Sequence, residues 1–468
     1  MKRLLFAIAI AIAELAASLA SAEPLSRAAA VGRALQKNPD VLRAQADFDG
    51  LNGRARQAKA DALPEVNAYG TFLRYQDPSF MNSPNIDQLP PELLQAFRPI
   101  PSNLWDGNVT LRQTVFSFSV SKAIRAAGYA KHMGQEGVAR ARQDVALRAI
   151  FAYNGYLVAL ERAKVAATVV RQKEKSLEMA RNRREAGVAT DLEVLRFEVG
   201  LANAHTDLLR YDGAADLARG DLNSVMTQAT DTPIEPTDTL DFVDVPGVEP
   251  AVVRQAATSR PELKAASWNE KIYDEAIGIY QADSRPRLDF NAAYGYSVRR
   301  PDNFLESNFK KWSLGVTLKV PVFDGFRTAG KVAQAKAERD RVGQDRRGLE
   351  SMIDLEAEQA LDRLRVARSV LQSAELNVTQ ARRVLEMTEA NYRLGASTTL
   401  DVLDAQAAFT QAEMTRVEAL WAHANARAGL RYVMGQDPLA AGPVPARTSS
   451  EQPTAAGGAL ADTTAGRQ

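Results

Sequence analysis

The sequence predicts a mainly α-helical protein with a small β part, built from two copies of one helix–strand–strand–long helix–helix unit. The first observation is a turn motif that occurs around Gly187 and again around Gly395. The second is that shorter motifs follow one another in the same order in both halves, which indicates a duplication. The third is a very long helical segment in each half, followed by a return helix.

Both copies of the turn motif carry the signals of a tight connection between two helices. A glycine suits the left-handed position that ends the first helix. A threonine lies three positions later, and an acid three positions after that, which is the spacing of an N-terminal capping box. These residues are Gly187, Thr190 and Glu193 in the first copy and Gly395, Thr398 and Asp401 in the second.

Composition excludes several classes of protein. The formal net charge of +1 does not indicate a nucleic-acid partner. Cysteine is absent, which rules out disulfides, thiolate metal sites and cysteine catalysis. The three histidines, His132, His205 and His423, are scattered along predicted helices without metal-ligand spacing, and we expect each at an ordinary helix surface. No phosphate-binding glycine motif is present. We therefore expect neither an enzyme nor a cofactor.

The first 22 residues have the pattern of a signal peptide. Lys2 and Arg3 precede an apolar run from Leu4 to Ala13, and Ala20-Ser21-Ala22 is a small-residue cleavage pattern. The apolar run is shorter than the ~20 residues that a membrane-spanning helix needs. We expect cleavage after Ala22 and export, so that any insertion into a membrane must use strands.

Matching motifs set the expected domain boundaries. Asn38-Pro39 and Arg260-Pro261 each open an alanine-rich helix, and Met226 and Met434 lie near the ends of the two halves. The expected segments are the signal peptide 1–22, the first repeat 23–226 with strands 64–76 and 105–117 and a helical hairpin 119–226, an acidic linker 227–250, the second repeat 251–437 with strands 286–299 and 311–323 and a helical hairpin 326–436, and a disordered tail 438–468.

Alternating apolar and polar residues predict the strands. The clearest case runs from Leu288 to Val298, and another runs from Trp312 to Val320. Each strand has about ten residues, the length of a tilted strand that crosses a bilayer. A half-buried sheet in a soluble domain would show the same alternation. Four strands are too few to form a closed barrel within one chain. Because an open sheet edge is not stable in lipid, closure of the barrel would need several copies of the chain, and three copies would supply twelve strands.

Each half contains one very long helical segment of roughly 66 residues, which corresponds to about 100 Å. Helices of this length are not found in ordinary globular domains. The two segments run from Ser119 to about Glu185 and from Arg327 to about Leu394, and both are rich in alanine. The return helices would run antiparallel to them. A coiled-coil or tubular assembly is the expected result.

The segment from Tyr392 to Gln406, together with the duplication, resembles the TolC family of outer-membrane efflux proteins over about Leu25 to Gln436. The resemblance implies a homotrimer in the cell outer membrane, with a shared twelve-stranded β-barrel continued by a twelve-helix α-barrel that crosses the periplasm. It also implies a periplasmic adaptor protein and an inner-membrane transporter of the RND, ABC or MFS type as partners, besides outer-membrane lipid. The expected activity is passive exit of small molecules.

The same resemblance assigns roles to residues at the turns. Asp401 and Asp404 lie three apart on one helix face, and a trimer would gather six such carboxylates into a constriction. A purely local role of both acids as helix caps is the alternative. The first half has Arg196 where the second has Asp404. The expected gate residues are Asp401, Asp404, Glu193, Tyr392 and Arg393; the expected adaptor-docking residues are Gly187, Val188, Ala189, Thr190, Leu394, Gly395 and Ser397.

Two other functions fit the same residues. Within the same class, the protein would be the exit duct of a type I protein-secretion system. In a different class, it would be a soluble periplasmic coiled-coil adaptor or scaffold. Arg183 and Arg184, which flank the first turn, would either hold the tip shut or form a solvated charged end.

Overall fold

The computed structural model describes residues 23–82, 90–92, 99–245 and 248–439. The expected signal peptide (1–22) and nearly all of the expected tail (438–468) lie outside the described residues. Among the described helices, none has a stretch that is both long and apolar enough to cross a membrane.

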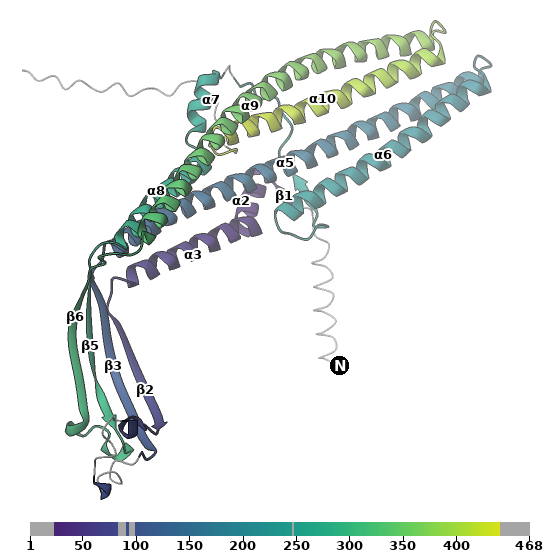
Figure 1. Cartoon of the computed structure of the whole chain (residues 1–468). Helices are drawn as coiled ribbons and strands as arrows, with labels where there is room; N and C mark the ends of the chain where they lie inside the picture. Colours follow the sequence, from purple (N-terminus) through teal and green to yellow (C-terminus); the bar gives the residue numbers. More distant parts are fainter. Residues whose placement is uncertain (1–22, 83–89, 93–98, 246–247, 440–468) are drawn as a thin grey trace, which may run out of the picture. The chain divides into compact units, whose positions relative to one another are not determined.

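The same order of five elements occurs twice (Figure 1). The first set consists of α3 (Pro39–Ala60), β2 (Glu65–Tyr75), β3 (Ser102–Phe116), α5 (Phe118–Glu185) and α6 (Asp191–Val225). The second set consists of α8 (Pro261–Ala282), β5 (Arg287–Val298), β6 (Lys310–Lys319), α9 (Arg327–Arg393) and α10 (Thr399–Val433). The shorter elements are β1 (Glu23–Leu25), α2 (Arg27–Lys37), β4 (Ile234–Pro236), α7 (Pro250–Ala257) and the 3-10 turns Ser79–Asn82, Pro301–Asn303 and Ser307–Phe309.

Two compact units each draw on both halves of the sequence. The hairpin unit falls within residues 1–38, 143–260 and 352–468, and the sheet unit comprises residues 39–142 and 261–351. The long helices α5 and α9 contribute residues to both units. The spatial units therefore do not coincide with the two sequence repeats, because equivalent segments of the two halves pack against each other.

The sheet unit contains one antiparallel sheet in the order β2–β3–β5–β6 (Figure 1). Tyr75 pairs with Ser102, so β3 begins three residues before its expected start. β6 ends at Lys319 rather than at 323, because Pro321 has no N–H to donate to a ladder.

The sheet has one apolar face, and much of this face is exposed. The pairing register aligns Val109, Tyr294 and Trp312 in one row across three strands. Trp312 and Leu314 are 71% and 68% exposed, and β6 is exposed along its whole length. A sheet packed on a soluble core, the alternative left open by the alternation, would bury this row. The structure contradicts that alternative for the described residues.

Helix α8 is held between α5 and α9 by ion pairs within the sheet unit. Glu275 of α8 pairs with Lys122 and Arg125 of α5, both at 3.0 Å. On its other side, Asp274 of α8 pairs with Arg339 of α9 at 3.1 Å. Burial opposes ionisation of the Glu275 carboxyl, but the two basic partners lower its pKa overall. Exposed pairs contribute little individually, so their role is to set the register of the three helices.

The hairpin unit contains a short parallel pair, β1 with β4, which the sequence patterns did not predict. Two tyrosines of α5 hold it in place: the Tyr153 hydroxyl donates to the Leu25 carbonyl at 2.8 Å, and the Tyr156 hydroxyl donates to the Ile234 carbonyl at 3.0 Å. Burial raises the pKa of Tyr153 to about 12. Both phenols therefore remain protonated donors at neutral pH.

A residue with a strained backbone conformation follows the end of α6, and its replacement tests how much this strain lowers stability. Thr227 has φ +57°, whereas the equivalent Gly435 after α10 has φ +67°. A β-branched residue in this conformation is strained by about 1 kcal/mol or more. We expect Thr227→Gly to raise the thermal unfolding temperature slightly, because the entropy cost of glycine offsets part of the gain.

The matched change is Gly435→Ala, which we expect to act in the opposite direction. The alanine would have to keep the left-handed backbone conformation, and its Cβ would lie 3.1 Å from the Ser259 hydroxyl oxygen. Differential scanning fluorimetry of both variants measures the two shifts. Shifts of the same sign in the two variants would contradict the strain argument.

Candidate functional site

The two helical turns close with the same backbone hydrogen bonds. After α5, the Val188 N–H donates to the Arg183 carbonyl at 2.9 Å and Gly187 has φ +75°. After α9, the Ala396 N–H donates to the Asn391 carbonyl at 2.8 Å and Gly395 has φ +77°. Both are Schellman motifs, in which a left-handed glycine satisfies the last helical carbonyls. The predicted left-handed glycines are confirmed.

The caps that start the return helices differ. In α10 the Thr398 hydroxyl accepts from the Asp401 N–H at 3.2 Å, and the Asp401 carboxylate accepts from the Thr398 N–H at 2.7 Å. In α6 the Thr190 hydroxyl accepts from the Glu193 N–H at 3.3 Å, but Glu193 does not return the bond. The reciprocal box predicted for both turns is therefore complete only in the second. The shorter side chain of Asp401 suits this return bond.

The two acids of the second turn have different surroundings. The hydrogen bonds from Thr398 lower the pKa of Asp401. The carboxylate of Asp401 is therefore ionised and occupied as the acceptor in the helix cap. Asp404 lies one turn further along α10 and is exposed. Within the described part of the chain, Asp404 has no hydrogen bond or ion pair. Its charge is therefore available to whatever approaches this face of α10.

Tyr392 is a core residue rather than an exposed one. Its side chain is 3% exposed and lies in a cluster with Phe197, whose ring centre is 6.2 Å away. Arg183 of α5 covers the ring, with its Cζ 4.6 Å from the ring centre, and donates to the Tyr392 carbonyl at 2.8 Å. The remaining members of the cluster are Leu177, Ala180, Val194 and Val402. The side chain of Tyr392 therefore joins the two hairpins within one chain.

The other arginines at the turns are exposed. Arg393 donates from Nε to the carbonyl of Glu389, four residues earlier, at 3.3 Å. Arg184 pairs with Asp191 across the first turn at 2.5 Å. Arg393 and Tyr392 were both expected at a gate, but Arg393 is exposed to solvent whereas Tyr392 is buried. Arg183 and Phe197 were not predicted as site residues, although the 3–4 spacing of apolar residues in α6 could have identified Phe197 as core.

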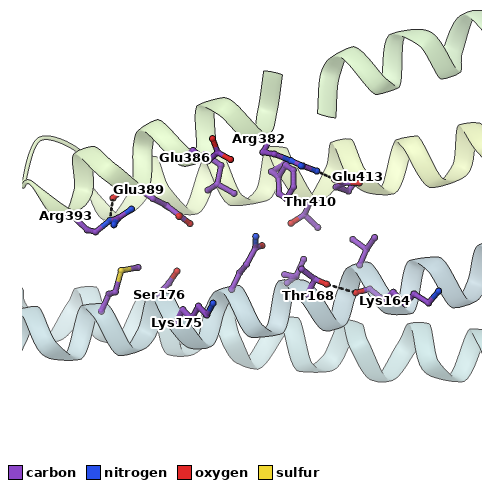
Figure 2. Close-up of a pocket in the computed structure, with 16 residues that line it drawn as sticks. Lys164, Thr168, Lys175, Ser176, Arg382, Glu386, Glu389, Arg393, Thr410 and Glu413 are labelled. Atoms are coloured by element: carbon purple, nitrogen blue, oxygen red, sulfur yellow. Dashed lines mark hydrogen bonds and ion pairs between the residues drawn. The ribbon is translucent and has the colours of Figure 1, made fainter. Parts of the chain in front are cut away.

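A groove of about 830 Å³ lies between the hairpins beside this cluster (Figure 2). Figure 2 shows Lys175 and Ser176 on α5 facing Glu386, Glu389 and Arg393 on α9. Arg382 on one wall pairs with Glu413 of α10 at 3.0 Å. The groove thus has charges of both signs along its rim, together with the apolar side chains Val165, Val169, Met179, Leu385 and Phe409.

Most of the expected docking residues are exposed at the turns. Val188 and Leu394 are 63% and 83% exposed, and both turn glycines are open to solvent. Ala189 and Ser397 are half-buried, and Thr190 serves as the helix cap. Large apolar side chains exposed at a turn are suited to contact another protein.

The histidines are not alike. His132 is exposed and stacks on Trp268, with ring centres 4.8 Å apart, and His205 is exposed. His423, in contrast, is only 1% exposed, so its assignment to the helix surface was wrong: it lies under Phe242 of the linker, 5.0 Å away. The described residues contain no cluster of acidic and histidine side chains that could hold a metal ion.

The family model for outer membrane efflux proteins matches residues 30–227 and 252–436, the greater part of both halves. The chain belongs to the outer membrane efflux protein family. The expected TolC-like family and outer-membrane location are confirmed, and the protein is an outer-membrane exit channel for efflux or secretion with a helical periplasmic extension. Membership in a family of channels also agrees with the expectation that it is not an enzyme, and it removes the soluble scaffold as an interpretation.

The regions of similarity to known relatives cover most of the chain. Outer membrane protein OprJ of Pseudomonas aeruginosa is 24% identical over 80% of this chain and 77% of its own length. The alkaline protease secretion protein AprF of the same organism is 21% identical over 70% of this chain and 69% of its own. The outer-membrane channel OprN has the same fold, with a TM-score of 0.75, 18% identity, and coverage of 87% and 89% of the two chains.

Proposed function

We propose that this protein is a trimeric exit duct for small molecules, with a barrel of twelve strands shared among three copies. The observation that carries the proposal is the antiparallel order β2–β3–β5–β6 with an exposed apolar face. Because the sheet has an even number of strands, its edge strands β2 and β6 run in opposite directions. β6 of one copy can therefore pair antiparallel with β2 of the next, which closes the sheet and leaves no edge in lipid.

The long helices are suited to line a tunnel shared by three copies. Each chain contributes α5, α6, α9 and α10, so three copies supply twelve helices. The exposed turn residues Val188 and Leu394 are suited to receive a periplasmic adaptor, and the groove between the hairpins extends that surface. The adaptor would connect the duct to an inner-membrane transporter of the RND, ABC or MFS type, which supplies substrate and energy.

Two experiments test this proposal. Membrane fractionation should recover a heat-labile trimer in the outer membrane, and deletion of the gene should increase susceptibility to several toxic compounds. Release of the protein by osmotic shock would contradict insertion. Complementation with the wild-type gene provides the control for deletion.

Protein secretion is the second candidate. The relative named as an alkaline protease secretion protein favours it, because it matches about 70% of this chain. If this function holds, deletion should remove one or a few proteins from the culture medium and leave susceptibility to toxic compounds unchanged. Comparing the secreted proteins and the susceptibility of one deletion strain therefore separates the two candidates.

Asp404 is our choice for the residue that sets ion selectivity at the constriction. Asp401 is less suitable for a clean test, because its carboxylate also accepts the capping bond from Thr398. In planar bilayers, Asp404→Asn should lower the ratio of cation to anion permeability roughly twofold or more, since a ring of like charges attracts counter-ions. Thermal stability should change little, because Asp404 forms no hydrogen bond or ion pair with any residue that the structure describes.

Asp362→Asn, in which an exposed acid paired with Arg365 at 2.8 Å loses its charge, is the control for position. Asp362 is a 67% exposed acid on α9, far along the helix from the turn. If Asp362→Asn and Asp404→Asn change selectivity equally, or if neither changes it, the acidic constriction at Asp404 is refuted.

A further inference from the structure

The two ends of the antiparallel sheet connect to different parts of the chain. At one end the strands join helices: α3 leads into β2, β3 into α5, α8 into β5 and β6 into α9. At the other end β2 turns back into β3, and β5 turns back into β6. Tyr296 and Lys310 are the last paired residues of β5 and β6 at this second end. Because the helical extension of the channel lies in the periplasm, the second end faces the outside of the cell.

Lys310 lies on the apolar face of the sheet. The register places it on the same side as Trp312 and Leu314. Lys311 lies on the opposite side, where it pairs with Asp106. Lys310 is exposed, and its ammonium group forms no hydrogen bond or ion pair with any residue that the structure describes. An unpaired ammonium group thus lies beside the apolar rows of this face.

Two tyrosine hydroxyl groups belong to the same face. Tyr296 is directly opposite Lys310 in the ladder, a position in which the Cβ atoms of the two residues are about 5 Å apart. The hydroxyl oxygens of Tyr296 and Tyr294 are 3.4 Å apart, and their ring centres are 6.0 Å apart. Only one hydrogen can lie between the two oxygens, so the second hydroxyl hydrogen is available to an acceptor outside the chain.

Further aromatic rings surround these donors. An added Cβ on Gly107, which is opposite Tyr296 in the ladder, would lie 2.6 Å from Cζ of Phe304, so the Phe304 ring covers this part of the apolar face. Its centre is 5.9 Å from that of the Tyr296 ring. Trp312, opposite Tyr294, is 71% exposed on the same face. Such rings are typical of the boundary between lipid chains and headgroups, which places the donors at headgroup level.

Two acids in the turn between β5 and β6 leave Lys310 unpaired. Asp302 lies in one 3-10 turn, and Glu306 directly precedes the next. Both are exposed, and neither forms an ion pair with Lys310 in the described part of the chain. The charge of Lys310 is therefore available to a headgroup.

We propose that Lys310 and the hydroxyl groups of Tyr296 and Tyr294 bind the anionic headgroup of a glycolipid in the outer leaflet of the outer membrane. Phosphate or carboxylate oxygens supply the acceptors that these donors lack, and a bond from an ammonium group to such an oxygen is charge-assisted. The acyl chains of the same lipid would cover the neighbouring apolar rows, which a free anion would leave exposed. This inference rests on the proposed barrel, because it requires this face of the sheet to lie in lipid.

Lipid A is the probe for this site, used once with its phosphate groups and once after their removal. The purified wild-type trimer in detergent is titrated with each form, and native mass spectrometry measures the bound lipid. We expect the phosphorylated form to bind about tenfold more tightly, as one charge-assisted hydrogen bond provides. Lys310→Gln should lose this preference, because it removes the ammonium charge. Tyr296→Phe should weaken binding of the phosphorylated form about two- to fivefold, because it removes a neutral donor.

Lys319→Gln is the control, because Lys319 is an exposed lysine at the opposite end of the same strand. This variant should bind both forms of lipid A as the wild type does. Inorganic phosphate at the same concentration should not displace the bound lipid, because it has no acyl chains to cover the apolar rows.

Three results would overturn the lipid site. They are equal binding of the two forms by the wild type, wild-type binding by either Lys310→Gln or Tyr296→Phe, and displacement of the lipid by inorganic phosphate. If the wild type is still recovered as a heat-labile trimer from the outer membrane, the proposed duct stands and only the lipid site fails. Absence of that trimer would overturn both.

Discussion

Replacement of Gly295 by alanine is expected to prevent the sheet from forming its present register. Gly295 is a buried residue of β5 and pairs with Asn108 of β3. A Cβ at this position would lie 2.6 Å from the Asn108 Cα and closer still to the Gly107 carbonyl oxygen. Both are backbone atoms, which cannot rotate away, so the cost should be at or above the about 1–3 kcal/mol typical of overpacking.

The expected result is little or no protein in the outer-membrane fraction, measured by the heat-labile oligomer band and by total antigen. Gly315→Ala in the neighbouring strand β6 is the control, since a Cβ there meets no atom within 4 Å. That variant should be recovered at the wild-type level. Normal recovery of Gly295→Ala would mean that β3 and β5 are further apart in the membrane than in this structure.

Truncation of Tyr392 to alanine also has a large expected effect, because the ring connects the two hairpins. Loss of a buried aromatic ring typically costs about 3–5 kcal/mol. Arg183 would also lose the ring that it covers. We expect the tips to separate more readily, which should increase the basal conductance in planar bilayers and the susceptibility of cells to large antibiotics.

Tyr392→Phe separates the ring from its hydroxyl. The hydroxyl is buried and has no hydrogen-bond partner among the described residues. Its removal should therefore leave stability unchanged or slightly raised, because an unsatisfied buried polar group is unfavourable. If Tyr392→Phe opened the channel as Tyr392→Ala does, the hydroxyl would have a partner in another copy, and ring packing would not be the main cause.

The helix ends and strand positions could be predicted well from sequence because their signals are local. Gly187 and Gly395 adopt the left-handed conformation that their positions indicated. Thr190 and Thr398 cap the return helices as their spacing to the next acid predicted. Each signal depends on hydrogen bonds between residues only a few positions apart. The alternation that located the strands is likewise a property of neighbouring residues.

The roles of individual site residues required the tertiary structure. Tyr392 was expected at a gate, yet its ring is buried against Phe197, which lies on the other hairpin. His423 was expected on a helix surface, yet the linker residue Phe242 covers it. Neither contact has a local pattern, because the partners are separated by almost two hundred positions.

By itself, then, the sequence determined the repeated order of elements, the turns and the family, all of which depend on short-range patterns. Only the tertiary structure decided which side chains at those turns are buried and which remain free. It buried Tyr392 between the two hairpins and left Asp404 exposed on α10. The physical reason is that burial depends on which helices pack together, and this packing brings the two halves of the chain into contact.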